Sequence, residues 1–522
     1  MIRAPMNHLH RTTTLLLSLL IVHGAYCQIP DWGKDMGAGG SDLASSLTTD
    51  VAGNVYITGF INGVVDLDPS GPEGTVGTAG VESFVLAKYL EDGEFAWGFA
   101  VPGARGNSIT SDPAGRLYVT GCFDASRDFD PSSASTVLTA VNGMDAFIAC
   151  YGSGGDLRWA HGRNADLRDT GTCISTAGGN AIYCTFHAAH EGAPGSALIL
   201  RYDADGLETW RMSIPSRGAT GWDVEAQLEG GFFVSGVLDG RSDLDPLFPP
   251  ALPLGSDGDR EFLARYQANG QLDWSLDLGA ERNVTINALA YRGGRIHMVG
   301  SFALTPWDVD PRGAHHTLTP TRSSSPDAFL VRYSREGNFQ QAFSLSGRRT
   351  GTGSGSVFKD IAVDGAGNVY VTGAFEGICD PDPSLSTTFE LTCNGRQDYF
   401  LAKYGADGGL IWVDAAGGAG IEHGTSVAVS RGGIHVCGWN ESREVEFGEL
   451  PDHVVNLSSA GSFDILMLHY PLESIGDDRA GSRKWIPIPK PYLIGAALLL
   501  VVIGFVVVRA RARAKDRSTR EA

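Results

Sequence analysis

The most repeated polar feature of the chain is a pair of aspartates separated by one residue and followed at once by proline. Five loops carry such a pair: Asp66 and Asp68, Asp128 and Asp130, Asp243 and Asp245, Asp308 and Asp310, Asp380 and Asp382. Aspartates at alternate positions of an extended segment can point both carboxylates to one side, and carboxylates on flexible loops suit Ca²⁺. These ten residues are therefore candidate calcium ligands.

A structural role competes with metal binding at the same loops. An aspartate ahead of a proline opens a turn, because its side chain caps free backbone N–H groups and the proline presets φ. The loops also lack the longer acidic string and the bidentate glutamate of dedicated calcium loops. We favour the turn and predict no required cofactor, with calcium as the alternative.

Other catalytic or metal-binding patterns are missing from the sequence. It contains no G-x-S-x-G and no complete G-x-x-x-x-G-K-[ST] motif, which leaves serine hydrolysis and nucleotide binding without support. His187, His190, His315 and His316 occur in variable loops without the spacing of a zinc site. We predict no catalytic residue and a protein that is not an enzyme.

The elements that position these loops recur along the chain. A short strand-like segment of the type GNVYITGF returns seven times, with starts 50 to 73 residues apart, at 53–60, 115–123, 180–186, 230–238, 294–302, 367–375 and 432–439. A second apolar run that ends in tyrosine follows each of them, first at 83–89 and last at 464–470. The chain is therefore an array of seven like units.

Each unit has the pattern of a four-stranded antiparallel meander. β-Branched and aromatic residues dominate short runs bounded by Gly, Asn and Asp. Several of these runs are apolar on both faces, so both faces of the sheet must be covered. Radial repetition packs each sheet between two neighbours. We predict an all-β fold, a seven-bladed β-propeller of four-stranded antiparallel blades.

The last unit lacks a fourth strand, and the missing strand lies at the other end of the chain. After Tyr470 nothing resembles the strands around Trp97 or Trp274, whereas the segment 29–36, which contains Trp32, has their pattern. We predict that 29–36 joins the last blade and closes the ring.

The combined pattern D-x-x-G-N-V-Y-x-T-G-x-F, D-x-D-P, D-x-F-x-x-K-Y and G-x-x-x-W resembles the seven-bladed β-propeller repeat (SBBP-type) family of bacterial surface and secreted proteins. The resemblance covers 29–470. Unit three lacks the acidic loop, and unit seven has Glu444-Val-Glu446 in place of the aspartates. The resemblance implies the propeller fold and an exported location, and it brings no catalytic residues.

The two ends of the chain predict a membrane address. Residues 1–27 have the basic start, apolar run and small-residue exit of a signal peptide, with a lipoprotein signal at Cys27 as the weaker alternative. The apolar run 492–508 has basic residues directly behind it, which is typical of a transmembrane helix with a cytoplasmic end. The domains are thus a signal peptide (1–27), a propeller (28–472), a stalk (473–491), a membrane helix (492–508) and a basic cytoplasmic tail (509–522). A sorting tail that is cleaved before covalent anchoring is the alternative for the C-terminal part.

Charge narrows the class of partner. The formal net charge of the chain is −20. Both chain ends are net basic, so the propeller between them is more negative than the whole chain and should repel nucleic acid. We predict a single-pass cell-membrane protein whose extracytoplasmic propeller is a binding scaffold for a protein or glycan. The alternatives are a glycan-cleaving propeller enzyme, which needs carboxylates converging near the axis, and a calcium-stabilised structural surface protein.

Cysteine spacing predicts disulfides in an oxidising compartment. Cys173 and Cys184 flank the Gly178-Gly179 turn symmetrically, which predicts one bridge. Cys379 with Cys393 is the second predicted pair, and Cys122 with Cys150 a third if the strand register allows it. Cys437 is the candidate free thiol, and reduced cysteines in the core are the alternative to all these bridges.

Overall fold

A computed structural model describes residues 26–71, 73–163, 168–189, 195–215, 222–248, 253–254, 259–280, 284–321, 325–347, 355–384, 389–450, 453–472 and 484–485. All regular elements in these ranges are β-strands. The chain divides into a large unit, 28–478, and a small unit formed by 1–27 with 479–522. In the small unit, strand β1 (Tyr26–Cys27) pairs antiparallel with β39 (Lys484–Trp485).

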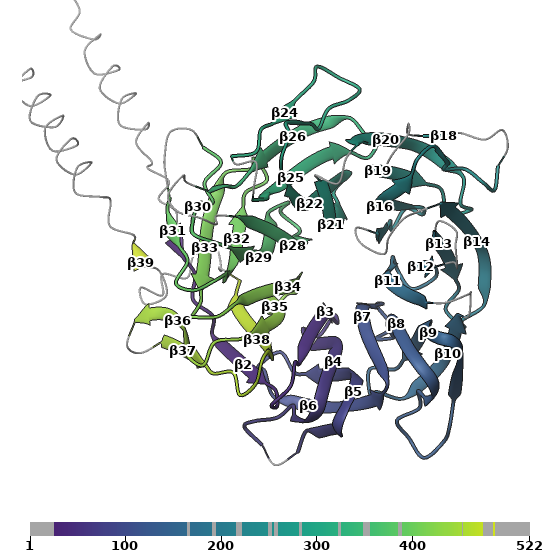
Figure 1. Cartoon of the computed structure of the whole chain (residues 1–522), viewed down its shortest axis with the longest axis vertical. Coiled ribbons are helices and arrows are strands. Elements are labelled where there is room, and N and C mark those ends of the chain that lie inside the picture. The colour runs from purple at the N-terminus through teal and green to yellow at the C-terminus, as the bar shows by residue number, and fades with distance from the viewer. Residues whose placement is uncertain are drawn as a thin grey trace, which may run out of the picture. The chain divides into compact units, whose positions relative to one another are not determined.

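The large unit is a ring of seven four-stranded antiparallel blades around an open centre (Figure 1). From the axis outward, blade one consists of β3 (Leu43–Thr49), β4 (Val55–Asp66), β5 (Thr75–Tyr89) and β6 (Phe95–Pro102). Blade two consists of β7 (Ala104–Ser111), β8 (Leu117–Asp128), β9 (Val137–Tyr151) and β10 (Leu157–Arg163). Blade three consists of β11 (Arg168–Thr176), β12 (Ile182–Ala189), β13 (Ser196–Tyr202) and β14 (Glu208–Pro215).

Blade four consists of β15 (Asp223–Ala226), β16 (Phe232–Asp239), β19 (Asp259–Tyr266) and β20 (Leu272–Ala280). Blade five consists of β21 (Val284–Arg292), β22 (Arg295–Phe302), β25 (Asp327–Ser334) and β26 (Phe339–Ser344). Blade six consists of β28 (Ser356–Val363), β29 (Val369–Phe375), β32 (Asp398–Tyr404) and β33 (Leu410–Ala416). Small sheets lie beside them: β17 (Ser242–Asp243) with β18 (Pro253–Leu254), β23 (Trp307–Asp308) with β24 (Thr317–Leu318), and β27 (Ser346–Gly347) with β30 (Ile378–Asp380) and β31 (Leu391–Thr392).

The seventh blade closes the ring with the N-terminal strand, as predicted. It consists of β34 (Glu422–Val429), β35 (Gly433–Asn440), β38 (Asp464–Pro471) and β2 (Trp32–Met36), with the hairpin of β36 (Val445–Leu450) and β37 (His453–Leu457) beside it. Strand β2 pairs antiparallel with β38 from Trp32 opposite His469 to Met36 opposite Ile465. Met36 is only 1% exposed and lies in the core between blades seven and one. The first and last segments therefore share one sheet.

The repeated Thr-Gly pair of the second strands fits a bulge in the first strands. Six of the seven innermost strands shift register by one residue, as β3 does between Ala44 and Ser46. A Cβ atom on Gly59 would collide with the carbonyl oxygen of Leu43, and one on Gly121 with that of Arg105. Glycine is needed here because the bulged backbone approaches it closely.

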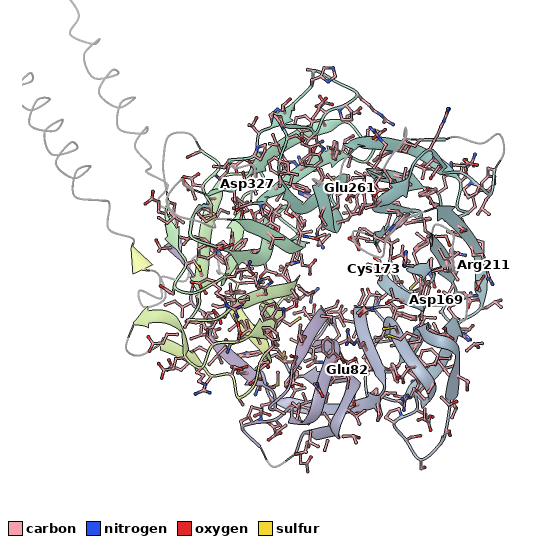
Figure 2. All side chains as sticks on the ribbon, viewed as in Figure 1. Glu82, Asp169, Cys173, Arg211, Glu261 and Asp327 are labelled. Carbon is pink, nitrogen blue, oxygen red and sulfur yellow. The ribbon has the colours of Figure 1, made fainter. Side chains whose placement is uncertain are left out.

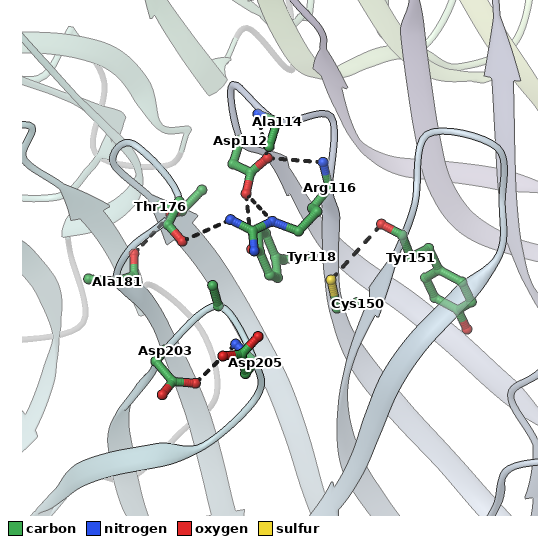
Figure 3. A network of polar contacts seen from close by, with 12 residues as sticks. Asp112, Ala114, Arg116, Tyr118, Cys150, Tyr151, Thr176, Ala181, Asp203 and Asp205 are labelled. Carbon is green, nitrogen blue, oxygen red and sulfur yellow. Dashed lines mark hydrogen bonds and ion pairs between the residues drawn. The ribbon is translucent and has the colours of Figure 1, made fainter.

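In three units, the Asp and the Tyr at the first turn form one hydrogen-bonded unit. Asp112 accepts hydrogen bonds from the backbone N–H groups of Ala114 (2.9 Å) and Arg116 (3.0 Å) and from the Tyr118 hydroxyl (3.1 Å) (Figure 3). Asp50 and Asp364 make the same set of contacts in blades one and six. This repeated motif therefore fixes a turn.

Tryptophans of the outermost strands link four of the blades to the next blade. Trp97 Nε1 donates to the Ser153 carbonyl (3.1 Å), and its ring covers Gly155, whose φ is +86°. Trp159, Trp210 and Trp274 make the equivalent hydrogen bonds at 3.0 to 3.2 Å. A glycine of positive φ, with no side chain, lets the indole lie flat on the neighbouring turn.

The predicted disulfides are wrong, because all seven cysteines from Cys122 to Cys437 are free. The strand register places Cys173 opposite Thr185 and Cys184 opposite Ile174, so the two side chains point to opposite faces of the sheet. Cys122 and Cys150 are opposite Ala146 and Tyr118, four residues apart along the strands.

The second predicted bridge, between Cys379 and Cys393, fails for a different reason. Cys379 is buried opposite Leu391, whereas the thiol of Cys393 donates to Asp398 (3.1 Å). Cys437 has a free thiol, as predicted, but so do the other six cysteines.

The predicted signal peptide, most of the stalk, the membrane helix and the basic tail lie outside the described residues. Within the described ranges, no helix has the length and apolar character needed to cross a membrane.

Candidate functional site

The five aspartate pairs lie in loops that fold over the outside of the ring. In each loop the first carboxylate accepts a hydrogen bond from the backbone N–H of the second aspartate, at 2.9 to 3.1 Å. The residue between the two aspartates points inward, and Leu67, Phe129, Leu244 and Val309 are completely buried. The predicted turn is therefore present in all five loops.

The tyrosine that ends each third strand anchors the same loops. Its hydroxyl donates to the carbonyl of the residue between the aspartates: Tyr89 to Leu67, Tyr151 to Phe129, Tyr266 to Leu244, Tyr333 to Val309 and Tyr404 to Pro381, at 2.7 to 3.0 Å. Each loop thereby covers the apolar core between two blades. Among the described residues, no group of three or more His, Cys, Asp or Glu side chains is arranged to hold a metal.

A cavity lined by the described residues lies on the ring axis. It has a volume of about 450 Å³ and is lined by the innermost strands β3, β7, β11, β15, β21, β28 and β34. Cys173 is beside the central opening in Figure 2. Every blade contributes one strand to this lining, so ligand-facing residues come from all seven units.

One position of the innermost strands forms a hydrogen-bonded belt around the cavity. This position directly follows the bulge in six blades and is the equivalent position of the unbulged strand in blade four. It holds Ser46, Ser108, Cys173, Asp223, Ala288, Asp360 and Ser426 in blades one to seven. At five junctions its side chain accepts from a backbone N–H of the next blade: Ser46 from Ile109, Ser108 from Ile174, Asp223 from Leu289, Asp360 from Val427 and Ser426 from Leu47. At the remaining two junctions, the Cys173 thiol donates to Asp223 and the Asn287 amide to Phe358.

Blade four carries two acids in this belt. Asp223 accepts from Leu289 N (2.6 Å) and from the Cys173 thiol (2.6 Å), and Glu225 accepts from Tyr291 N (3.1 Å) and from the Ser175 hydroxyl (3.1 Å). Burial raises the pKa of Asp223 to about 7 and that of Glu225 to about 8, and the negative charges of the neighbouring acids add to both shifts. Both side chains are half-buried, because they border the narrow axial cavity while protein surrounds them on the other sides.

Blade six supplies the third acid. Asp360 accepts from Val427 N (2.8 Å) and the Ser426 hydroxyl (2.7 Å), and burial raises its pKa to about 6. Its charge reaches blade four, since it raises the pKa of both Asp223 and Glu225. Lys359, next to it in the lining, has a pKa lowered by burial. The cavity wall thus holds three coupled carboxyl groups, titrating near neutral pH, and one lysine.

This arrangement can bind a polar or cationic group and exchange protons with it. Perturbed carboxyl groups in a cavity are typical of functional sites, although hydrogen-bonded structural networks shift pKa values as well. None of these three acids was among the sequence-based candidates, which all lie at the outer edge. An alignment of the seven innermost strands would have found them, because Asp223 and Asp360 stand where other units have serine.

Comparisons with known proteins give a distant relative. No protein-family model matches the chain. It is 21% identical over 509 residues, or 87% of its length, to an uncharacterized WD repeat-containing protein of Acanthamoeba polyphaga mimivirus, and it spans only 34% of that relative.

Among solved structures, Sqt1 from Chaetomium thermophilum is 10% identical with a TM-score of 0.39, and covers 86% of this chain and 100% of its own. A protein of unknown function from Dyadobacter fermentans is 9% identical with a TM-score of 0.36, and covers 84% of this chain and 99% of its own. The WD-repeat relative and the seven observed blades agree on a repeat-built β-propeller.

Proposed function

We propose that the protein is a membrane-anchored, extracytoplasmic interaction scaffold that binds a protein or a glycan. The proposal rests on the observation that the repeated residues have structural roles. The turn aspartates, the loop aspartate pairs, the tryptophans and most of the axial belt all serve to hold blades and loops together. The loops that differ between units can therefore determine binding specificity, as is usual for loops on a rigid repeat scaffold.

The similarity to a WD repeat-containing protein supports a scaffold for protein interaction. The bacterial surface location, the SBBP-type family and the membrane anchor belong to the proposal and rest on the sequence of the two chain ends and on the repeat pattern. A net charge of −20 favours cationic surfaces on the partner.

Two measurements test this proposal. The propeller, residues 28–472, is applied to glycan and cell-surface protein arrays, with a variant that replaces one variable loop by a Gly-Ser segment of equal length as the matched control. We expect saturable binding to one class of ligand that the loop variant loses. Separately, the full chain should sediment with membranes and a chain ending at residue 491 should not. Soluble full-length protein, or binding that no loop exchange affects, would contradict the proposal.

A glycan-cleaving enzyme is the second candidate, and the axial acids are the observation that favours it. Glu225, whose pKa is raised to about 8, is protonated at neutral pH as a general acid must be, and Asp360 is mostly ionised. The test is release of sugar from a glycan library by the wild-type protein and by the Glu225→Gln variant. Hydrolysis that the variant loses supports an enzyme, and the absence of hydrolysis on every substrate leaves the scaffold.

A further inference from the structure

A row of three facing residues crosses the second, third and fourth strand of every blade. In blade one it is Tyr56, Lys88 and Trp97, paired across the strands in this order. The other rows are Tyr118, Cys150, Trp159; Tyr183, Arg201, Trp210; Phe233, Arg265, Trp274; His297, Arg332, Gln341; and Tyr370, Lys403, Trp412. Five of these six rows thus place a permanent cation beside aromatic or amide groups, and Lys88 Nζ lies 5.3 Å from the Tyr56 ring centre.

Blade seven, which closes the ring, departs from this pattern. Its row is His435, His469 and Trp32, with two neutral imidazoles where other blades have an aromatic ring and a cation. The His469 ring stacks on Trp32 with centroids 5.4 Å apart, and the His435 ring lies 4.8 Å from that of His469. His435 is 1% exposed and His469 is 7% exposed. The two histidines are the only side chains of this row whose ordinary pKa, about 6.5, lies between pH 5 and 7.

The indole hydrogen bond that fastens the fourth strand in blades one to four is missing at the closure. Trp32 covers Gly93 of blade one as Trp97 covers Gly155, but Trp32 Nε1 has no hydrogen-bond partner in the described part of the chain. Trp97, Trp159, Trp210 and Trp274 each donate to a carbonyl of the next blade. Strand β2 is therefore held at this end by backbone pairing and by stacking on the histidine pair.

The groups around the pair have opposing effects. Burial lowers the pKa of His435 to about 3, and the neighbouring His469 adds to that effect. Burial also lowers the pKa of His469, although Asp31, the backbone at Gly432 and Glu91 of blade one act in the opposite direction. Ser430 faces the Nε2 atom of His435 at 3.3 Å. Elsewhere on the closing strand, burial raises the pKa of Asp35 to about 7, so this residue favours the closed ring in acid.

We propose that the His435–His469–Trp32 row is an acid-sensitive latch, which releases strand β2 and opens the ring between blades seven and one when the medium is acidified. Release exposes both imidazoles to water, where they take up protons freely, whereas the closed ring resists their protonation. A ligand that clamps blades one and seven would accordingly be released in acid.

The size of the effect follows from proton linkage. Each histidine that titrates normally in the open state raises the ratio of open to closed ring about tenfold per pH unit below its ordinary pKa of about 6.5. Two histidines, opposed by Asp35, leave a net uptake of up to one proton when the ring opens. Between pH 6.5 and 5 we expect the open fraction to rise about tenfold, because each histidine is already half protonated in the open state at pH 6.5. The Asp35→Asn variant should raise it about 250-fold over the same interval, since the opposing proton is removed.

Hydrogen exchange of the full-length protein measures the latch directly. The protection factor of a peptide covering residues 32–36 is determined between pH 7 and 5 and compared with that of residues 262–266 in blade four. We expect the first to fall about tenfold and the second to stay constant. The double variant His435→Tyr with His469→Lys, which copies the row of blade one, should keep β2 protected at both pH values.

Two further variants keep the test decisive. His297→Tyr removes a buried histidine of blade five, whose pKa is likewise lowered to about 3, and should leave the acid response of residues 32–36 unchanged. If the double variant does not fold, His435→Tyr alone should reduce the pH dependence of β2 exchange by one proton. Protection that falls equally in all blades, does not fall at all, or still falls in the double variant would overturn the latch.

Discussion

Replacing Glu225 with glutamine tests the description of the axial cavity most sharply. Glutamine has the shape of glutamate, and its carbonyl oxygen can accept from Tyr291 N while its amide donates to the Ser175 hydroxyl, so both hydrogen bonds of Glu225 persist. The substitution removes only the titrating proton. Any change in stability that depends on pH therefore reports the cost of ionising a carboxyl group in this wall.

The sign and the size follow from the pKa. The pKa of Glu225 rises from 4.5 to about 8 in the folded protein, chiefly because of burial, so the fold favours the neutral acid. Its contribution to stability is present below pH 4.5 and is lost as the pH rises through 8. One pKa unit corresponds to about 1.4 kcal/mol, which sets a ceiling of about 5 kcal/mol at pH 8. Water in the cavity screens the charge, and we expect a gain of about 1 to 3 kcal/mol for Glu225→Gln.

Urea unfolding of the wild-type protein and the variant at pH 4.5 and 8 measures this difference. We expect equal free energies of unfolding at pH 4.5 and a more stable variant at pH 8. Asp223→Asn is the matched contrast: Asp223 accepts hydrogen bonds on both oxygens, and an amide would face one donor with another, so this variant should be less stable at both pH values. Equal stability of Glu225→Gln and wild type at pH 8, or an equal gain at both pH values, would refute the reasoning.

Three further outcomes are expected. Tyr151→Phe removes the hydrogen bond to the Phe129 carbonyl (3.0 Å) and should lower the free energy of unfolding by about 1 kcal/mol in urea titration; a loss near zero would mean that the tyrosine does not anchor its loop. Met36→Ala should lower the free energy of unfolding by about 2 to 5 kcal/mol and make the N-terminal segment accessible to protease. Met298→Ala, at an equally buried methionine of blade five, should lower it by as much without that cleavage. The same digestion pattern for both variants would speak against closure by β2. Millimolar Ca²⁺ should leave the melting temperature unchanged, because the first carboxylate of every aspartate pair already holds its own turn; a rise of several degrees would restore the ten aspartates as calcium ligands.

The axial acids show why some site residues escape analysis of a single repeat unit. Asp223 and Asp360 are 137 positions apart in sequence and lie in different blades, so no local motif connects them. Only the ring brings their strands to one axis, where their charges interact. The aspartate pairs attracted attention because they recur, but recurrence within a repeat protein mostly marks residues that hold the units together.

What the sequence by itself determined was the architecture. Strand length, apolar character on both faces and the number of units are local properties, and an unfinished last unit with a matching N-terminal segment leaves one way to close the sheet. The tertiary structure alone decided the fate of the cysteines and the place of the acids. A shift of one residue in strand register turned Cys173 away from Cys184, because successive side chains of a strand point to opposite faces. Long-range packing likewise folded the aspartate loops outward and directed the carboxylates of Asp223, Glu225 and Asp360 to the axis, since each backbone N–H of the neighbouring blade needed an acceptor there.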